Sequence, residues 1–239
     1  MIDLENSDFI SSIYNLSQTN RSFISISGKS GTGKTTLVLQ LVSFILTSEK
    51  PYESSCVWIQ ASELFPKKRL LSLFKTSPDK IKYLLQNIFV YPVKKPFSNN
   101  REQSAFFNDL GTLLLPPNVK FMVIDNISHH LRFAVSLNSD MKRRAILFDQ
   151  FFNSQLFPLI MRCLRENIVL LLIHEVSFNP GLGRTQPFFN KLYSRIQSVS
   201  ITLSKNFKSN IKVMEIDCGE KSEVRKLNYE IGDSGILRL

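Results

Sequence analysis

Three glycines stand within six residues of a chain that has only nine, and a lysine and two threonines follow them directly. Their spacing fits the phosphate-loop pattern G-x-x-x-x-G-K-[ST]. Glycine allows a positive φ and a close backbone approach to a ligand, so successive N–H groups can surround an anion. We therefore expect nucleotide binding by Gly28, Lys29, Ser30, Gly31, Thr32, Gly33, Lys34, Thr35 and Thr36.

The residues around this loop favour a ligand site over an ordinary glycine turn. Residues 23–27 alternate large apolar side chains with serine, which is typical of a strand, and residues 35–47 have apolar residues at helical spacing. A phosphate loop requires this order of strand, loop and helix. In such a loop Lys34 reaches the β- and γ-phosphates of ATP, and the Thr35 hydroxyl holds Mg²⁺.

A carboxylate that completes the Mg²⁺ shell is supplied by the stretch FMVID, in which four apolar residues precede Asp125. The strand places Asp125 at its carboxyl end, where open α/β sheets bind ligands. An aspartate at a strand end can instead cap a turn. Together with the phosphate loop, the Mg²⁺ role is the better interpretation.

Apolar runs alternate with helical patterns along the whole chain, which predicts an α/β fold with a mainly parallel sheet flanked by helices. The last three strands follow one another without helices, so we expect an antiparallel run at the carboxyl end. We see no linker or repeat and expect a single domain over residues 1–239. Predicted strands cover residues 23–27, 55–60, 87–91, 120–125, 167–173, 198–203, 210–216 and 226–231, and predicted helices cover 35–47, 67–76, 101–114, 141–166 and 187–193.

Composition excludes several classes of protein. No apolar run approaches the length of a membrane span and the first residues are acidic, so we expect a cytoplasmic protein with no membrane contact. Cys56, Cys163 and Cys218 are far apart and indicate neither disulfides nor a zinc site. The net charge is +10, and residues 177–212 contain six basic residues and no acidic one. Such a stretch favours a polyanionic partner.

The order of several blocks resembles the core ATPase domain of the RecA/RadA recombinases, and most of all short archaeal RadA paralogues such as RadB. These blocks are ISGKSGTGKT, VWIQASELFPKKRL, FMVIDNISHHLR, NIVLLLIHEV and EVRKLNYEIGDSGI. The resemblance implies a RecA-like P-loop NTPase that uses ATP and Mg²⁺, with Thr35 and Asp125 as metal ligands and Lys34 on the phosphates.

Two catalytic positions depart from the family pattern. In the family a glutamate after the second strand polarises the attacking water, but an ungapped match places Ser62 there and Glu63 one residue later. Glu63 serves as the base only if the turn is shifted by one residue. At the position of the family's γ-phosphate sensor, usually glutamine, this chain has Glu175, preceded by His174.

The resemblance also implies two DNA-binding loops, over residues 132–145 and 177–195. Their basic residues are Arg184, Lys191 and Arg195, with Lys142, Arg143 and Arg144 as secondary candidates. The chain begins 27 residues before Gly28, so the family's N-terminal helix-hairpin-helix domain is not expected. The Phe-x-x-Ala tether between protomers is not clear either, because Phe9 is followed by Ser12 in place of alanine.

These features lead us to expect a DNA-dependent ATPase that acts as an accessory recombinase paralogue in recombination and repair. Its partners would be single-stranded or junction DNA, RadA or a junction nuclease, and further copies of itself or of a related chain. An alternative is an ATP-binding adaptor that hydrolyses poorly, which the missing in-register glutamate favours. Another is an ATPase of the circadian-clock or replicative-helicase branches, against which the acid-free stretch 177–212 argues.

Overall fold

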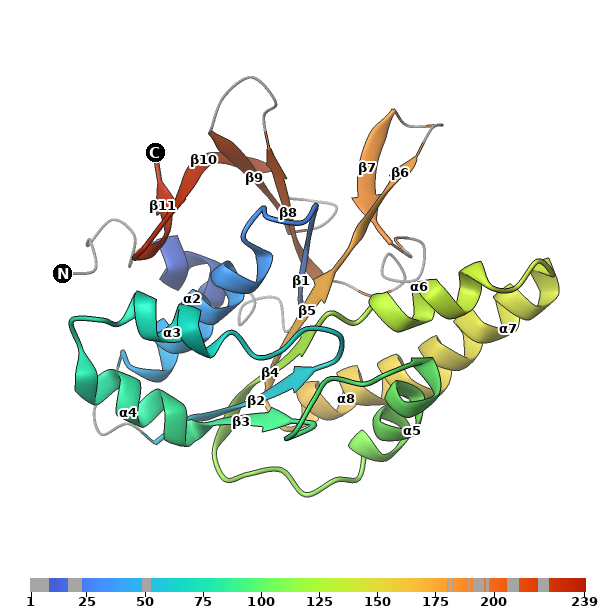
Figure 1. The fold of residues 1–239 in the computed structure, drawn as a ribbon, viewed down its shortest axis with the longest axis horizontal. Coiled ribbons are helices and arrows are strands. Elements are labelled where there is room, and N and C mark those ends of the chain that lie inside the picture. Colours follow the sequence, from blue (N-terminus) through green and yellow to red (C-terminus); the bar gives the residue numbers. More distant parts are fainter. Residues whose placement is uncertain are drawn as a thin grey trace.

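A nine-stranded sheet forms the centre of the computed structural model, in the order β11-β10-β9-β8-β1-β5-β4-β2-β3 (Figure 1). Strands β8, β1, β5, β4, β2 and β3 are parallel to one another. From β8 onward the pairing is antiparallel: β9 pairs with β8, β10 with β9 and β11 with β10. This confirms the predicted α/β class and the antiparallel carboxyl-terminal run. The structure describes residues 9–16, 23–48, 53–179, 181, 183–188, 190, 196, 198–205, 211–218 and 224–239.

The strands of the large sheet are β1 (Phe23–Gly28), β2 (Ser55–Gln60), β3 (Ile88–Tyr91), β4 (Val119–Asp125), β5 (Val169–His174), β8 (Ser198–Lys205), β9 (Lys212–Asp217), β10 (Arg225–Gly232) and β11 (Gly235–Arg238). A second sheet is a hairpin of β6 (Val176–Asn179) and β7 (Arg184–Pro187). Residues 9–16 are helical. The other helices are α2 (Lys34–Leu46), α3 (Lys67–Leu73), α4 (Pro78–Asn87), α5 (Asn100–Leu110), α6 (His129–Ser136), α7 (Met141–Gln150), the π-helical η1 (Phe151–Leu156) and α8 (Phe157–Arg165).

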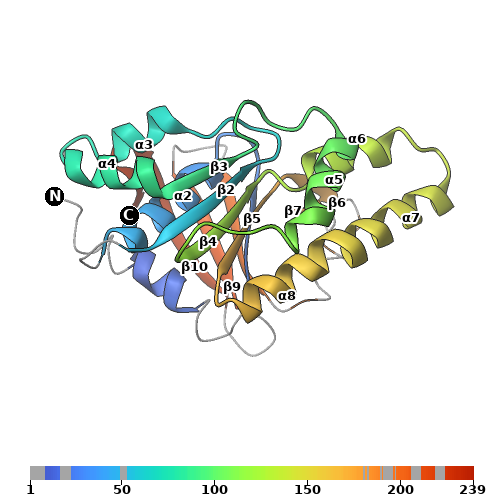
Figure 2. The same ribbon diagram turned by 90° about the horizontal axis from the view of Figure 1, so that it is seen from below.

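Helices cover both faces of the parallel sheet (Figure 2). Successive strand residues point to opposite faces, so Trp58 and Val123 join the core under α2, α3 and α4. Their neighbours Val57 and Ile124 join the core under α5, α6 and α8. Burial on both faces explains why these strands are continuous apolar runs in the sequence.

Every predicted strand is present, with boundaries that differ by at most two residues. The predicted helix 141–166 is divided into α7, η1 and α8. Pro158 lies in the first turn of α8 and has no N–H to donate, which interrupts the regular helical hydrogen bonds at this point. Helices α4 and α6, strand β11 and the β6–β7 hairpin were not predicted from the sequence. Among the described residues no helix has the length and apolarity needed to cross a membrane.

Two of the predicted loops are not loops in the structure. Residues 132–145 lie mainly in α6 and α7, which extend from the sheet as a helical arm (Figure 1). Residues 177–187 belong largely to the β6–β7 hairpin, so the expected helix at 187–193 does not begin at residue 187, although Asn190 is helical. Phe188 is in a turn, and residues 189 and 191–195 lie outside the described part of the chain.

Candidate nucleotide-binding site

The phosphate loop connects β1 to α2 at the carboxyl edge of the parallel strands. Gly31 and Gly33 have φ values of 73° and 92°, a backbone conformation that favours glycine. A Cβ on Gly28 would lie 2.6 Å from the carbonyl oxygen of Leu203, and one on Gly33 would lie 2.7 Å from Ile231 Cδ1. The tertiary structure therefore requires glycine at these positions, in agreement with the motif.

Lys34 folds back over the loop. Its Nζ donates hydrogen bonds to the carbonyl oxygens of Gly28 at 2.9 Å and Lys29 at 3.2 Å. Burial lowers the pKa of Lys34, while Asp125, Glu175 and Glu63 each act to raise it. An ammonium group held among carbonyl oxygens and nearby carboxylates is suited to binding a phosphate, because it is partly desolvated before the ligand arrives.

Thr35 and Asp125 meet across the site from α2 and β4. The Thr35 hydroxyl donates to Asp125 Oδ2 at 3.0 Å, and Asp125 is only 2% exposed. Burial raises the pKa of Asp125 to about 6, against the lowering effect of the Thr35 hydrogen bond, and Glu63 raises it further. The two predicted metal ligands are thus brought together, although 90 residues separate them.

The donor atoms of this site fit Mg²⁺ and the phosphates of a nucleotide. Mg²⁺ prefers hard oxygen ligands such as a carboxylate and a hydroxyl, and it usually takes further ligands from substrate phosphates. A buried carboxylate with a raised pKa is stabilised in its charged form by a bound cation. Within the described ranges no three His, Cys, Asp or Glu residues form a metal cluster.

The segment that follows β2 is where a hydrolytic base is expected. Strand β2 ends at Gln60, which is paired in register with Asp125. The Gln60 side chain is engaged with backbone atoms: it donates to the Pro92 carbonyl and accepts from the Phe65 N–H. Ser62 donates its N–H to the Asp125 carbonyl, and Glu63 follows in an exposed bend. Glu63 is close enough to influence Asp125 and Lys34 electrostatically.

Glu175 lies between the phosphate loop and the helical arm, directly after β5. Its carboxylate accepts hydrogen bonds from Arg132 at 2.6 Å, His129 Nδ1 at 3.0 Å and Asn126 at 3.2 Å. Burial raises the pKa of Glu175, but the His129 and Arg132 hydrogen bonds outweigh it, so the net pKa is lowered. We call Asn126, His129, Arg132 and Glu175 the Glu175 cluster. The Arg132 guanidinium offsets the carboxylate charge that would otherwise repel a phosphate.

The Glu175 cluster also touches the β6–β7 hairpin. The Arg132 guanidinium lies 5.1 Å from the ring centroid of Phe188, and the Phe188 N–H donates to the Glu175 carbonyl at 2.8 Å. His129 and Arg132 are three residues apart on α6 and share one face of that helix. The carboxyl end of β5, the start of α6 and the end of the hairpin are therefore connected at one point.

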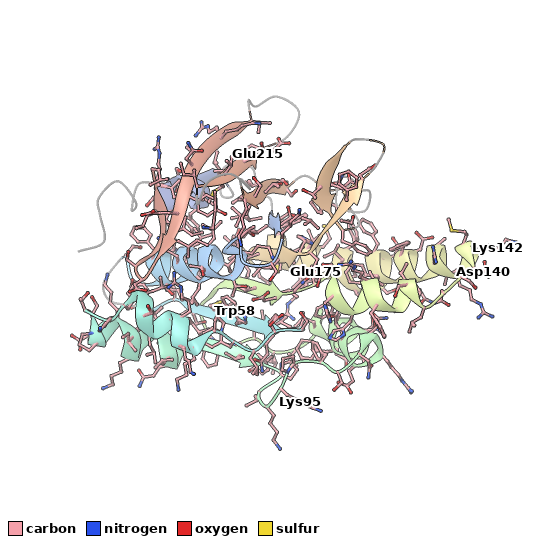
Figure 3. The ribbon with its side chains drawn as sticks, turned by 45° about the horizontal axis from the view of Figure 1, so that its top comes forward. Trp58, Lys95, Asp140, Lys142, Glu175 and Glu215 are labelled. Carbon is pink, nitrogen blue, oxygen red and sulfur yellow. The ribbon has the colours of Figure 1, made fainter. Side chains whose placement is uncertain are left out.

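The predicted DNA-binding residues fall in two places. Lys142, Arg143 and Arg144 are in the first turn of α7, and Figure 3 shows Lys142 and Asp140 at the far end of the helical arm, away from Glu175. Arg143 pairs weakly with Asp140 at 3.9 Å. The backbone of Arg184 is in β7. Lys191 and Arg195 lie outside the described residues, so the structure does not place them.

Some residues at the site were not identified from the sequence. Tyr229 on β10 donates a hydrogen bond to the Thr32 carbonyl at 2.7 Å, and nothing in its local sequence indicates this. His129 begins α6 and was not singled out as a site residue. His174 is a fully buried residue whose pKa is lowered to about 3 by desolvation, which keeps it neutral. The three-residue spacing of His129 and Arg132 was the one available signal for the Glu175 cluster.

Comparisons with known proteins agree with this geometry. The family model of the NB-ARC domain matches residues 9–82, which contain the phosphate loop. The solved crystal structure of the RadB recombinase is similar over 90% of this chain and 89% of its own, with a TM-score of 0.67 and 20% sequence identity. No curated protein matches. At that identity the likeness establishes the fold alone: the chain has a RecA-like fold of the kind seen in the RadB recombinase, with its phosphate-loop motif between β1 and α2.

Proposed function

We propose that this chain binds ATP with Mg²⁺ and hydrolyses it in a DNA-dependent way, as an accessory recombinase paralogue acting in the cytoplasm in recombination and DNA repair. The observation that carries the proposal is the 3.0 Å hydrogen bond between Thr35 and Asp125 beside the phosphate loop. It joins the two expected Mg²⁺ ligands. The RecA-like fold supports the recombinase assignment, since the similar structure is that of a RadB recombinase.

Each residue then has a defined task. Lys34 and the loop N–H groups bind the phosphates, and Thr35 and Asp125 hold the metal. When bound, Mg²⁺ neutralises charge on the β- and γ-phosphate oxygens. Glu63 orients or deprotonates the attacking water if the bend after β2 turns it inward. Glu175 reports the state of the site to the β6–β7 hairpin through its contacts with Arg132 and Phe188.

DNA would contact the hairpin and the arm. Arg184, Lys191 and Arg195 neutralise phosphates in this proposal, and Lys142, Arg143 and Arg144 extend the basic surface along α7. ATP raises DNA affinity only if it binds the DNA-competent state more tightly than the other state. RadA, a junction nuclease or further copies of this chain are the protein partners that fit such a role.

A second candidate is an ATP-binding adaptor with little hydrolysis. It is favoured by one observation: Gln60 occupies the end of β2 with both side-chain groups engaged, and Glu63 is exposed beyond it. An adaptor would use ATP to stabilise its own fold or its interface with a recombinase or junction-processing partner.

Steady-state ATP hydrolysis with and without single-stranded DNA separates the two candidates, with Lys34→Ala as the inactive control. A parallel DNA titration at two salt concentrations compares Arg184→Ala with the control Lys95→Ala. Lys95 is exposed at the edge of the molecule that lies away from the β6–β7 hairpin (Figure 3). DNA-stimulated turnover that Lys34→Ala abolishes supports the ATPase. ATP binding without turnover under any DNA condition supports the adaptor, and absence of ATP binding rejects both.

A further inference from the structure

The carboxyl-terminal hairpin of β10 and β11 packs directly on the phosphate loop and on α2. Tyr229 is 1% exposed, and its hydroxyl donates to the carbonyl of Thr32, which is fully buried. Two residues further along β10, Ile231 fills the space beside Gly33, where even one added carbon would collide. On β11, the Ile236 N–H donates to Oε1 of the buried Gln40 on α2 at 2.8 Å, and Gln40 Nε2 donates to the Ile236 carbonyl at 3.2 Å.

The acceptor of the Tyr229 hydrogen bond lies at a sensitive point of the loop. Thr32 stands between Gly31 and Gly33, both of which have positive φ. Within the loop, Thr32 donates two hydrogen bonds to the Lys29 carbonyl, a long one from its N–H at 3.3 Å and one from its hydroxyl at 2.8 Å. A phosphate loop binds through N–H groups that point inward, so its carbonyl groups must be held outward. The Tyr229 hydroxyl holds one of them from outside the loop.

We propose that Tyr229 is a positioning residue for nucleotide binding, and that the β10–β11 hairpin is through it a working part of the phosphate site. This inference rests on the proposed function, since it concerns the same nucleotide. Tyr229 does not touch the ligand; it fixes the backbone that does. A loop already held in its binding conformation loses less conformational entropy when the ligand arrives, and therefore binds more tightly. By linkage, a bound nucleotide stabilises the hairpin in return.

The test compares Tyr229→Phe with Tyr83→Phe. Both tyrosines donate their hydroxyl to a backbone carbonyl, Tyr229 to Thr32 and Tyr83 to Ser54, but Tyr83 is on α4, away from the loop. We would titrate each variant with ADP and Mg²⁺ and measure hydrogen exchange of the peptide covering residues 28–36. For Tyr229→Phe we expect ADP binding about three- to tenfold weaker, the worth of one buried hydrogen bond, and faster exchange of this peptide. For Tyr83→Phe we expect lower thermal stability with unchanged ADP affinity.

Several outcomes decide the matter. Equal ADP affinity in Tyr229→Phe and wild type would overturn the inference, as would equal losses in the two variants, which indicate a purely structural role. Ile231→Val removes the methyl group beside Gly33 and is the second variant if Tyr229→Phe does not fold; unchanged loop exchange and affinity there would also overturn the inference. Failure of the proposed function looks different, because then wild type and Lys34→Ala both fail to bind ADP.

Discussion

The phosphate loop and the Glu175 cluster lie on either side of one site, yet they are built in opposite ways. The loop takes its residues from one continuous stretch, 28–36, and its backbone conformation is specified by glycines within that stretch. The Glu175 cluster takes its residues from the end of β4, from α6 and from the end of β5, and its members are joined by side-chain hydrogen bonds. A local ligand site is therefore visible as a motif, while a cluster assembled by the fold is not.

This contrast predicts that changes in the loop act strongly on ligand binding, and that changes in the cluster act weakly and jointly. The strongest expected effect is that of Lys34→Ala. Removing the ammonium group that would face the phosphates of ATP should weaken ATP binding by about 3 kcal/mol, roughly a hundredfold or more. Titration with a fluorescent ATP analogue measures it, with Lys95→Ala as the control. Similar affinities in these two variants would contradict the placement of the phosphates.

Asp125→Asn should stabilise the nucleotide-free protein at neutral pH. The pKa of Asp125 is raised from 3.8 to about 6 in the folded chain, so its ionisation costs stability as the pH rises through that interval. Below the lower value both states are protonated and the cost is absent; above the higher value it is complete, at about 2 to 3 kcal/mol.

Denaturant unfolding of Asp125→Asn and wild type at pH 4, 5 and 7, with a chelator and without nucleotide, measures this difference. We expect a gap between the two proteins that widens with rising pH. A gap of the same size at all three pH values would show that the carboxylate is not destabilised by burial. The same variant should lose Mg²⁺-dependent nucleotide binding, because the carboxylate that lowers stability is also the expected metal ligand.

Gly33→Ala tests whether the loop conformation depends on its neighbours. The φ of 92° and the 2.7 Å approach to Ile231 Cδ1 both oppose a side chain at this position. We expect a loss of about 1 to 3 kcal/mol in the free energy of unfolding. Gly111→Ala is the matched control, because Gly111 has a φ of −63° and open space around it. If both substitutions change the thermal midpoint equally, the backbone conformation and close contacts at Gly33 do not disfavour a side chain there.

The smallest expected effect belongs to the ion pair of Arg132 and Glu175. Both side chains are partly exposed, so solvent screens the pair and its coupling should be no more than about 1 kcal/mol. A double-mutant cycle with Arg132→Gln and Glu175→Gln measures the coupling, and Arg165→Gln, which alters a more exposed pair with Glu166, is the control. A coupling that changes when ATP is added would support transmission from the site to the hairpin. A coupling of zero both with and without ATP would contradict transmission from the nucleotide site to the hairpin through this pair.

Most of the sheet followed from the sequence because its strands are apolar runs buried on both faces. The helices that were missed lack such a signal: α4 has one buried residue, Leu84, and α6 begins with two histidines. Helix α6 was missed because the resemblance assigned residues 132–145 to a DNA-binding loop, whereas the helix predicted from residue 141 is present as α7. Phe9, considered as a tether to another protomer, is buried in the chain's own core.

By itself, the sequence determined the phosphate loop, the strand that presents Asp125 and the parallel α/β class. These depend on short-range properties: glycine conformation, apolar runs and residue spacing. Only the tertiary structure decided that Thr35 hydrogen-bonds to Asp125, that Arg132 and His129 hydrogen-bond to Glu175, and that Tyr229 hydrogen-bonds to the loop from 197 residues away. The physical reason is that a hydrogen bond between distant segments depends on the register and packing of whole elements, which no local pattern records.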